Sequence, residues 1–386
     1  MFRRTFSRGW PAWGPAADLG VRRPLAFTLL FVGLVCAQVS VDDAMRMVAA
    51  GRLDEAETAL RNLTAANPRD ADLHYRLGLV LVKQKKLDEA GTVLSETTRI
   101  DPKFVFAWLA LSDLSFRRGD SAAAIAQAKR AEERAGDSAT AWKALAVLEA
   151  RIGDAGGQAR ALEGLLRLTP EDRQSRLRLA NLLLEHRNAN ATLAVTDGFP
   201  NDAELLRLHG LALYGLGRKE EAIDSFLAAM EAAPKEELVH AAVETLLPDA
   251  GNKLPQIRER LNRFMSERPD SPLGPFLLAL ASGSDEGLLR KAISIDPNFW
   301  PAYFELHRIL RAQGKIPEAI EALETTLRLN PNHEGAHYAL AQLYLETGDR
   351  KKAQEHRAEH HRLRAAAAEA EQKRSADAPK LSVTTQ

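Results

Sequence analysis

A 34-residue repeat in the positions of alanine, glycine and proline constrains this chain more than any other feature. One phase of the repeat holds the alanines Ala56, Ala90, Ala124, Ala222, Ala319 and Ala353. Glycine recurs five residues before that phase, at Gly51, Gly119, Gly153, Gly217, Gly314 and Gly348. Proline recurs twelve residues after it, at Pro68, Pro102, Pro170, Pro234 and Pro331. Self-similarity at this period is typical of an array in which each unit buries its apolar face against its neighbours.

Each repeat unit is predicted to be a pair of helices. In the unit 203–236, apolar residues recur at i, i+3, i+4 and i+7, which is helical periodicity. The glycine at position 15 of a unit can take the left-handed conformation that ends a helix. The proline at position 32 stops a second helix, because proline lacks the N–H and clashes with the preceding turn. Small residues at positions 8 and 20 let the two helices cross closely, and one at position 27 admits the next unit.

Specific residues give the repeat a family resemblance. Unit 203–236 carries Leu206, Gly210, Leu213, Ala222, Phe226, Ala229 and Pro234 at positions 4, 8, 11, 20, 24, 27 and 32. Trp108 and Leu111, and then Trp142 and Leu145, repeat a Trp-x-x-Leu spacing. This pattern resembles the tetratricopeptide repeat. The resemblance implies an all-α fold, a right-handed α-α superhelix of about ten helical hairpins.

Three segments are expected along the chain: a signal peptide at 1–37, a solenoid at 38–367 and a disordered C-terminal tail at 368–386. The predicted units are 37–70, 71–104, 105–138, 139–172, 173–202, 203–236, 237–271, 272–299, 300–333 and 334–367. Units five, seven and eight have lost most signature residues, so only their place in the repeat spacing supports them as units. The Ala-rich stretch from Ala365 is expected to extend the last helix, and the small polar residues from Ser375 onward are typical of a disordered end.

The N-terminal segment is predicted to direct export. Arg22 and Arg23 precede a short apolar run, and Val35-Cys36-Ala37 is a small-residue cleavage pattern. The run is too short for a comfortable transmembrane helix, which needs about 20 apolar residues. We therefore expect a bacterial periplasmic or secreted protein with no membrane insertion after cleavage; an uncleaved membrane anchor is the alternative.

Composition narrows the classes of partner. Cys36 is the only cysteine and would leave with the signal, so the mature chain would have neither a disulfide nor a cysteine metal site. The whole chain has 52 basic and 52 acidic side chains. Because five arginines and one aspartate lie within residues 1–37, the mature chain would be slightly acidic. That balance argues against nucleic acid as the main partner.

One short motif matches an enzyme. His333-Glu334-Gly335-Ala336-His337 has the H-E-x-x-H spacing of zinc proteases, which need both histidines on one helical face. However, it spans the junction of two units, and His337 stands where Trp108 and Trp142 stand in other units. The sequence therefore favours a repeat junction over a metal site. We expect no catalytic residue, cofactor or metal, with a metalloprotease or metal-binding protein as the alternative.

The resemblance also implies a binding surface. In this family, positions 2, 5, 9, 12 and 13 of each first helix line the concave groove. In this chain these positions hold Tyr75, Phe106, Leu109, Phe116, Arg117, Lys143, Arg151, Arg207, Tyr214, Phe304, Arg308, Arg311 and Tyr338. Aromatic and arginine side chains are enriched where proteins bind one another, although such residues can also complete the packing of a superhelix.

These observations together predict a non-enzymatic exported scaffold or adaptor that binds a peptide or protein partner in its concave groove. A subunit of a cell-envelope export or secretion assembly is the second reading. The identity of the partner and the oligomeric state are not written in the sequence.

Overall fold

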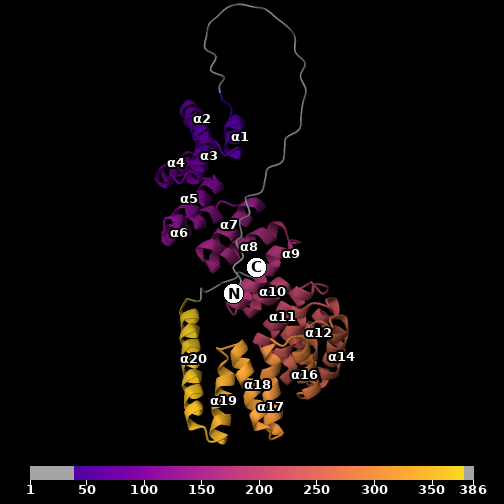
Figure 1. The fold of residues 1–386 in the computed structure, drawn as a ribbon. Coiled ribbons are helices and arrows are strands. Elements are labelled where there is room, and N and C mark those ends of the chain that lie inside the picture. Colours follow the sequence, from indigo (N-terminus) through magenta and orange to yellow (C-terminus); the bar gives the residue numbers. More distant parts are fainter. Residues whose placement is uncertain (1–38, 378–386) are drawn as a thin grey trace, which may run out of the picture.

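The structure of the protein, a computed structural model, describes residues 39–377, and these form an array of paired helices (Figure 1). The first helices of the units are α1 (Val41–Ala49), α3 (Ala71–Lys83), α5 (Val105–Arg117), α7 (Ala139–Ile152), α9 (Arg173–Glu185), α11 (Ala203–Gly215), α13 (Glu237–Ala241), α15 (Leu273–Ala281), α17 (Trp300–Ala312) and α19 (Glu334–Glu346). The second helices are α2 (Leu53–Ala66), α4 (Leu87–Ile100), α6 (Ser121–Glu132), α8 (Ala155–Leu168), α10 (Ala189–Thr196), α12 (Lys219–Ala232), α14 (Leu254–Glu267), α16 (Glu286–Ile295), α18 (Ile316–Leu329) and α20 (Arg350–Asp377). The described residues contain no strand, so the predicted all-α solenoid is confirmed.

The turn inside each hairpin has the predicted left-handed residue. Glycine takes a positive φ at Gly51, Gly119, Gly153, Gly217, Gly314 and Gly348. In two units a larger residue occupies the same position: Lys85 has φ 64° and Arg187 has φ 56°. A side chain there is strained, because its Cβ crowds the backbone in the left-handed conformation. The repeat therefore imposes the turn even where glycine is missing.

The small residues of the repeat let paired helices approach closely. A Cβ added to Gly78 of α3 would lie 2.6 Å from Leu94 of α4. A Cβ on Gly210 of α11 would lie equally close to Phe226 of α12. Ala90 and Ala222, at position 20, are fully buried. Positions 8 and 20 thus do what the sequence predicts, which is to bring the two backbones together.

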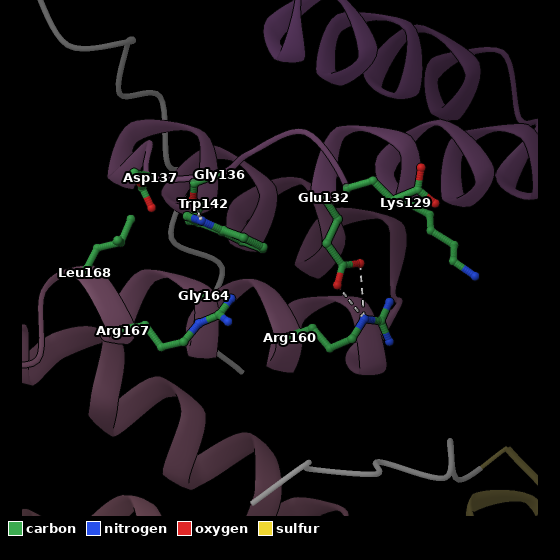
Figure 2. A pocket seen from close by; sticks show the side chains of 10 residues that line it. Lys129, Glu132, Gly136, Asp137, Trp142, Arg160, Gly164, Arg167 and Leu168 are labelled. Atoms are coloured by element: carbon green, nitrogen blue, oxygen red, sulfur yellow. Dashed lines mark hydrogen bonds and ion pairs between the residues drawn. The ribbon is translucent and has the colours of Figure 1, made fainter. Parts of the chain in front are cut away.

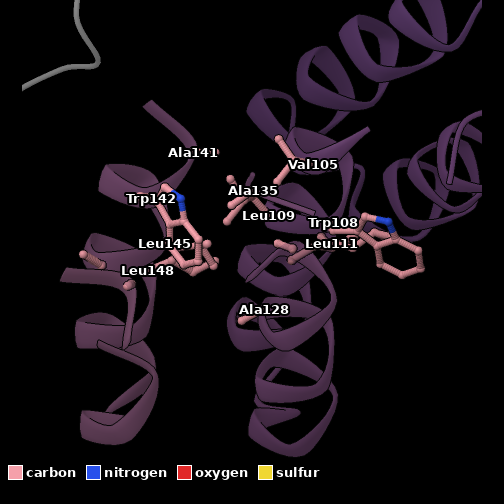
Figure 3. Packing of buried hydrophobic residues seen from close by; sticks show 14 of the residues in the cluster. Val105, Trp108, Leu109, Leu111, Ala128, Ala135, Ala141, Trp142, Leu145 and Leu148 are labelled. Atoms are coloured by element: carbon pink, nitrogen blue, oxygen red, sulfur yellow. The ribbon is translucent and has the colours of Figure 1, made fainter. Parts of the chain in front are cut away.

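The residue at position 4 ties the first helix to the preceding turn. Trp108 Nε1 donates to the carbonyl oxygen of Pro102 at 3.0 Å, and Trp142 Nε1 donates to that of Gly136 at 2.8 Å. Both tryptophans are buried and belong to the same large hydrophobic cluster, of which Figure 3 labels members from α5 to α7. Position 4 is therefore a core position of the repeat.

The hydrophobic core is divided near the middle of the array. One large cluster extends from Ala44 to Ala191 and a second from Leu213 to Ala353. A small separate cluster lies between them, where α9 meets α11; its members are Leu177, Ala180, Leu205 and Leu208. The short helix α10 belongs to this junction, so unit five couples the two halves with fewer buried residues than its neighbours supply.

Units five, seven and eight are irregular, as their sequences suggest. In unit seven the first helix stops after α13, and the chain continues as two 3₁₀ helices, η1 (Ala242–Asp249) and η2 (Gly251–Lys253). Pro248 lies inside η1 and Pro255 in the first turn of α14. Proline removes a helical hydrogen bond, which explains why a regular α-helix does not form there.

The C-terminal boundary differs from the prediction. The Ala-rich stretch from Ala365 extends the last helix, as expected, but α20 continues to Asp377, so the predicted tail boundary at residue 368 falls inside this helix. Alanine and glutamate dominate 365–371 and are strong helix formers, so the helix propagates past the last packed unit. Residues 378–386 and the predicted signal peptide 1–37 lie outside the described part. No helix within 39–377 is both long and apolar enough to cross a membrane.

Candidate functional site

The predicted groove residues fall on one side of the first helices. We call this surface, positions 2, 5, 9, 12 and 13 of each first helix, the first-helix face. Lys143, Arg117, Arg151, Arg308, Arg311 and Tyr338 are exposed there, and Tyr75, Phe106, Phe116, Tyr214 and Phe304 are half-buried. Leu109 and Arg207 are buried. Most of the predicted set is thus accessible to a partner, and Leu109 is instead a core residue.

Asp113 joins several predicted residues of units three and four. Its carboxylate accepts from Arg117 Nε at 2.7 Å and pairs with Arg151 at 2.5 Å. The Arg151 guanidinium also lies over the Phe116 ring, 5.8 Å from its centroid. Two cations share one carboxylate, so this part of the first-helix face carries an excess of positive charge.

Other predicted residues make contacts that hold the array together, within a unit or between neighbouring units. Tyr214 donates to Asp249 at 3.2 Å, Arg311 pairs with Glu346, and the Tyr75 ring packs on Phe104 at 5.1 Å. Burial raises the pKa of Tyr75 to about 12, so its hydroxyl stays protonated at neutral pH. These contacts show that a groove-facing position can also serve the packing of the superhelix.

The remaining predicted residues lie in units nine and ten. Arg308 pairs with Glu305 of the same helix at 3.0 Å. The Phe304 ring lies 4.3 Å from that of His333, and Tyr338 lies 5.3 Å from His360 of α20. The aromatic residues at this end therefore make two separate ring contacts, one between α17 and the start of α19 and one between α19 and α20.

Exposed apolar side chains recur at the groove positions of several first helices. Of the seven large apolar residues that are most exposed among the described ones, four occupy positions 2, 5, 9 or 12: Leu238 (56%), Tyr338 (54%), Val147 (50%) and Leu345 (51%). Sequence reasoning selected only Tyr338 of these, because it favoured aromatic and arginine residues. The sequence nevertheless places Val147, Leu238 and Leu345 at groove positions, so the register of the repeat alone could have identified them.

The H-E-x-x-H motif is built into a repeat junction. His333 is the N-cap of α19, and its Nδ1 accepts from the Ala336 N–H at 3.0 Å. The buried His337 bonds to the Pro331 carbonyl oxygen at 3.1 Å and to His356 at 3.0 Å. Within residues 39–377 no group of three or more His, Cys, Asp or Glu is arranged to hold a metal. The histidines of the motif, as the structure describes them, are therefore not arranged as a set of zinc ligands.

A shallow pocket of about 820 Å³ is lined by residues of α6, α7 and α8 and of the loop before α7 (Figure 2). Its lining mixes both charges: Arg160 pairs with Glu132 at 2.8 Å, and Arg167 lies over the Trp142 ring at 5.7 Å. Arg160 and Glu132 neutralise each other and Arg167 packs on an aromatic ring, so the fold accounts for these side chains, and we take the first-helix face as the candidate site.

The fold defines the class as an α-α solenoid of helical hairpins. Models of the tetratricopeptide repeat match residues 44–103, 109–173, 177–237 and 310–356, more than half of the chain. The chain belongs to the tetratricopeptide repeat family. No curated protein matches it.

Several solved structures are similar to this chain. Yeast Tom70 is 14% identical, with 88% of this chain and 96% of that chain covered and a TM-score of 0.43. The Naa15/Naa10 complex bound to HypK-THB is 16% identical, covering 81% and 66%, with a TM-score of 0.37. YrrB, a TPR protein with an unusual peptide-binding site, is 15% identical, covering 48% and 98%, with a TM-score of 0.36.

Proposed function

We propose that this protein is a non-enzymatic scaffold that binds a peptide or protein partner along its first-helix face. The observation that carries this proposal is that Val147, Leu238, Tyr338 and Leu345 are exposed at groove positions of the first helices in units four, seven and ten. Repeat proteins bind partners along extended surfaces to which successive units contribute, so exposed apolar residues at these positions can line one such surface. The aromatic and arginine residues around them are the types enriched at binding hot spots.

We further propose that the protein acts after export. The charged residues, short apolar run and Val35-Cys36-Ala37 pattern at the N-terminus support this. N-terminal sequencing of the exported form should then begin at Gln38. Recovery of the full-length chain from the membrane fraction would contradict cleavage and favour the anchored form.

Site-specific photo-cross-linking tests the binding face. A photoreactive phenylalanine analogue is placed at Val147 or Tyr338 on the first-helix face. The matched control is Ile125, which is also an exposed apolar residue (40%) but lies on the second helix α6. We expect the same partner to be cross-linked from Val147 and Tyr338 and not from Ile125. Adducts from Ile125 alone would place binding on the opposite side, and a partner drawn from a membrane complex would identify an envelope assembly.

A further inference from the structure

A buried arginine lies on the first-helix face where the core is divided. Arg207 stands at position 5 of α11 and is only 9% exposed. Its helical neighbours Leu205 and Leu208 belong to the small cluster that joins α9 to α11. Glu204 precedes Arg207 by three residues, and Leu211 and Tyr214 follow it by four and seven, so all three share its face of α11. The guanidinium is therefore carried on the candidate binding face, at the junction of the two halves.

This guanidinium has no carboxylate partner in the described structure. Its Nε is buried without an acceptor, and Arg207 forms no ion pair within residues 39–377. The nearest acidic residue along the helix, Glu204, pairs instead with Arg173 of α9 at 3.3 Å. Burial without full compensation lowers the pKa of Arg207, although the negative charge of Glu204 opposes this. The positive charge of Arg207 is thus largely removed from water, and no neighbouring carboxylate is paired with it.

A neighbouring arginine shows how the fold uses a guanidinium for structure. Arg176 of α9 donates from its two terminal nitrogens to the carbonyl oxygens of Val195 at 2.9 Å and Pro170 at 2.6 Å. It also stacks on Phe199, with its Cζ 4.3 Å from the ring centroid. Arg176 therefore joins α9 to α10 and the preceding turn. Arg207 makes no comparable set of bonds, so structure alone does not explain it.

The physical chemistry of guanidinium points to a ligand. It has donors on three nitrogens and no acceptor, and it matches a carboxylate in a two-bond geometry. A buried, unpaired cation destabilises a fold, and an apolar side chain of similar volume would relieve that cost. An arginine that is largely buried and unpaired on a binding face is therefore suited to bind a carboxylate of a partner protein.

We propose that Arg207 anchors an acidic side chain of a partner protein segment. The neighbouring surface adds an apolar requirement: Leu238 of α13, which packs against α11, is 56% exposed. The segment that fits has a glutamate or aspartate next to an aliphatic residue. This inference deepens the proposed protein-binding function and rests on it.

Two peptide libraries test the anchor with the full chain. Both are decapeptides with blocked ends and uncharged random positions; the central pair is Glu-Leu in one and Gln-Leu in the other. We expect the wild-type protein to retain the Glu-Leu library at least tenfold better. Arg207→Met should abolish this preference, whereas Arg328→Met, which removes an exposed charge from α18, should keep it. Equal retention of the two libraries, or retention of neither, would overturn the anchor.

Thermal unfolding without peptide gives a second readout. Arg207→Met should raise the unfolding midpoint, because it removes an unpaired buried charge. A lowered midpoint would show that Arg207 serves the fold and would refute the anchor. Equal library retention with intact cross-linking from Val147 and Tyr338 would reject the anchor alone. Loss of both libraries and of those cross-links would reject the proposed function as well.

Discussion

Nδ1 of His337 lies 3.0 Å from Nδ1 of His356, so one proton joins helix α19 to helix α20. Nε2 of His337 is 3.1 Å from the Pro331 carbonyl oxygen, which can only accept; Nε2 therefore carries the proton of that ring. His356 is then the donor to His337. The bond to Pro331 is the one that Trp108 makes to Pro102, so His337 keeps the repeat's contact and adds one to the last helix.

We expect mild acid to loosen α20. Burial, and then the neighbouring His337, lowers the pKa of His356 below its usual 6.5. The folded state then binds fewer protons than the unfolded state, so stability is lost as the pH falls below about 6.5. Hydrogen-exchange protection factors, which correct for the intrinsic pH dependence of exchange, should be lower over residues 350–363 at pH 5 than at pH 7.5, while those of α6, which contains no histidine, should change less. An equal loss of protection in both helices would show that the histidine pair is not responsible.

Glu149 should make the protein less stable at alkaline pH. It is 2% exposed, its Oε2 has no hydrogen-bond partner, and it packs on Gly157 of α8. Burial, and then the nearby Asp154, raises its pKa to about 8. The stability that the fold gains from keeping Glu149 protonated is fully present below about pH 4.5 and is lost as the pH rises through about 8.

The variant Glu149→Gln should therefore stabilise the fold by about 1–3 kcal/mol at pH 8 and by less at pH 5, because it removes the buried charge. Denaturant unfolding at both pH values measures this difference. Glu171→Gln, at an exposed site in the following loop, is the control and should change neither value appreciably. A gain that does not depend on pH would mean that Glu149 remains ionised.

The turn position of unit two offers a test of backbone strain. Lys85 adopts φ 64° where most units have glycine. Lys85→Gly should stabilise the protein by about 0.5–1 kcal/mol, since relief of the left-handed strain exceeds the added flexibility of glycine. The reverse change, Gly119→Ala in unit three, should destabilise it by about 1–2 kcal/mol. If the two variants changed the free energy of unfolding in the same direction, the strain argument would fail.

The middle of the array should open before the rest. Unit seven has a five-residue α13 followed by 3₁₀ helices, and the core is divided just before it. In repeat arrays stability is a sum of local and neighbour terms, so an irregular unit opens first. Hydrogen exchange should show less protection over 237–298 than over 71–172. Uniform protection would indicate that the buried residues of α14 and α15 compensate.

The repeat itself made much of this fold predictable. The period fixed the hairpins, the turn glycines and the burial of Trp108, because each depends on neighbours within one or two units. Other features depend on contacts between units that spacing does not encode. Asp113 is shared by Arg117 and Arg151 only in three dimensions, and the burial of Arg207 depends on the division of the core. The extension of the last helix past Ala365 was predicted, but the tail boundary at residue 368 falls inside α20, because it was drawn near the end of the last packed unit.

The first-helix face of unit three allows binding to be separated from stability. Phe106 and Phe116 are half-buried on this face of α5, whereas Trp108 is buried and bonded to Pro102. Phe106→Ala with Phe116→Ala should weaken partner capture by more than about 2 kcal/mol, as for aromatic anchors, and leave the chain folded. Trp108→Ala should instead destabilise the fold by about 3–5 kcal/mol, as for a core truncation. Calorimetric binding and denaturant unfolding of both variants measure the two effects. Unchanged binding by a folded double variant would mean that the partner does not contact unit three on this face.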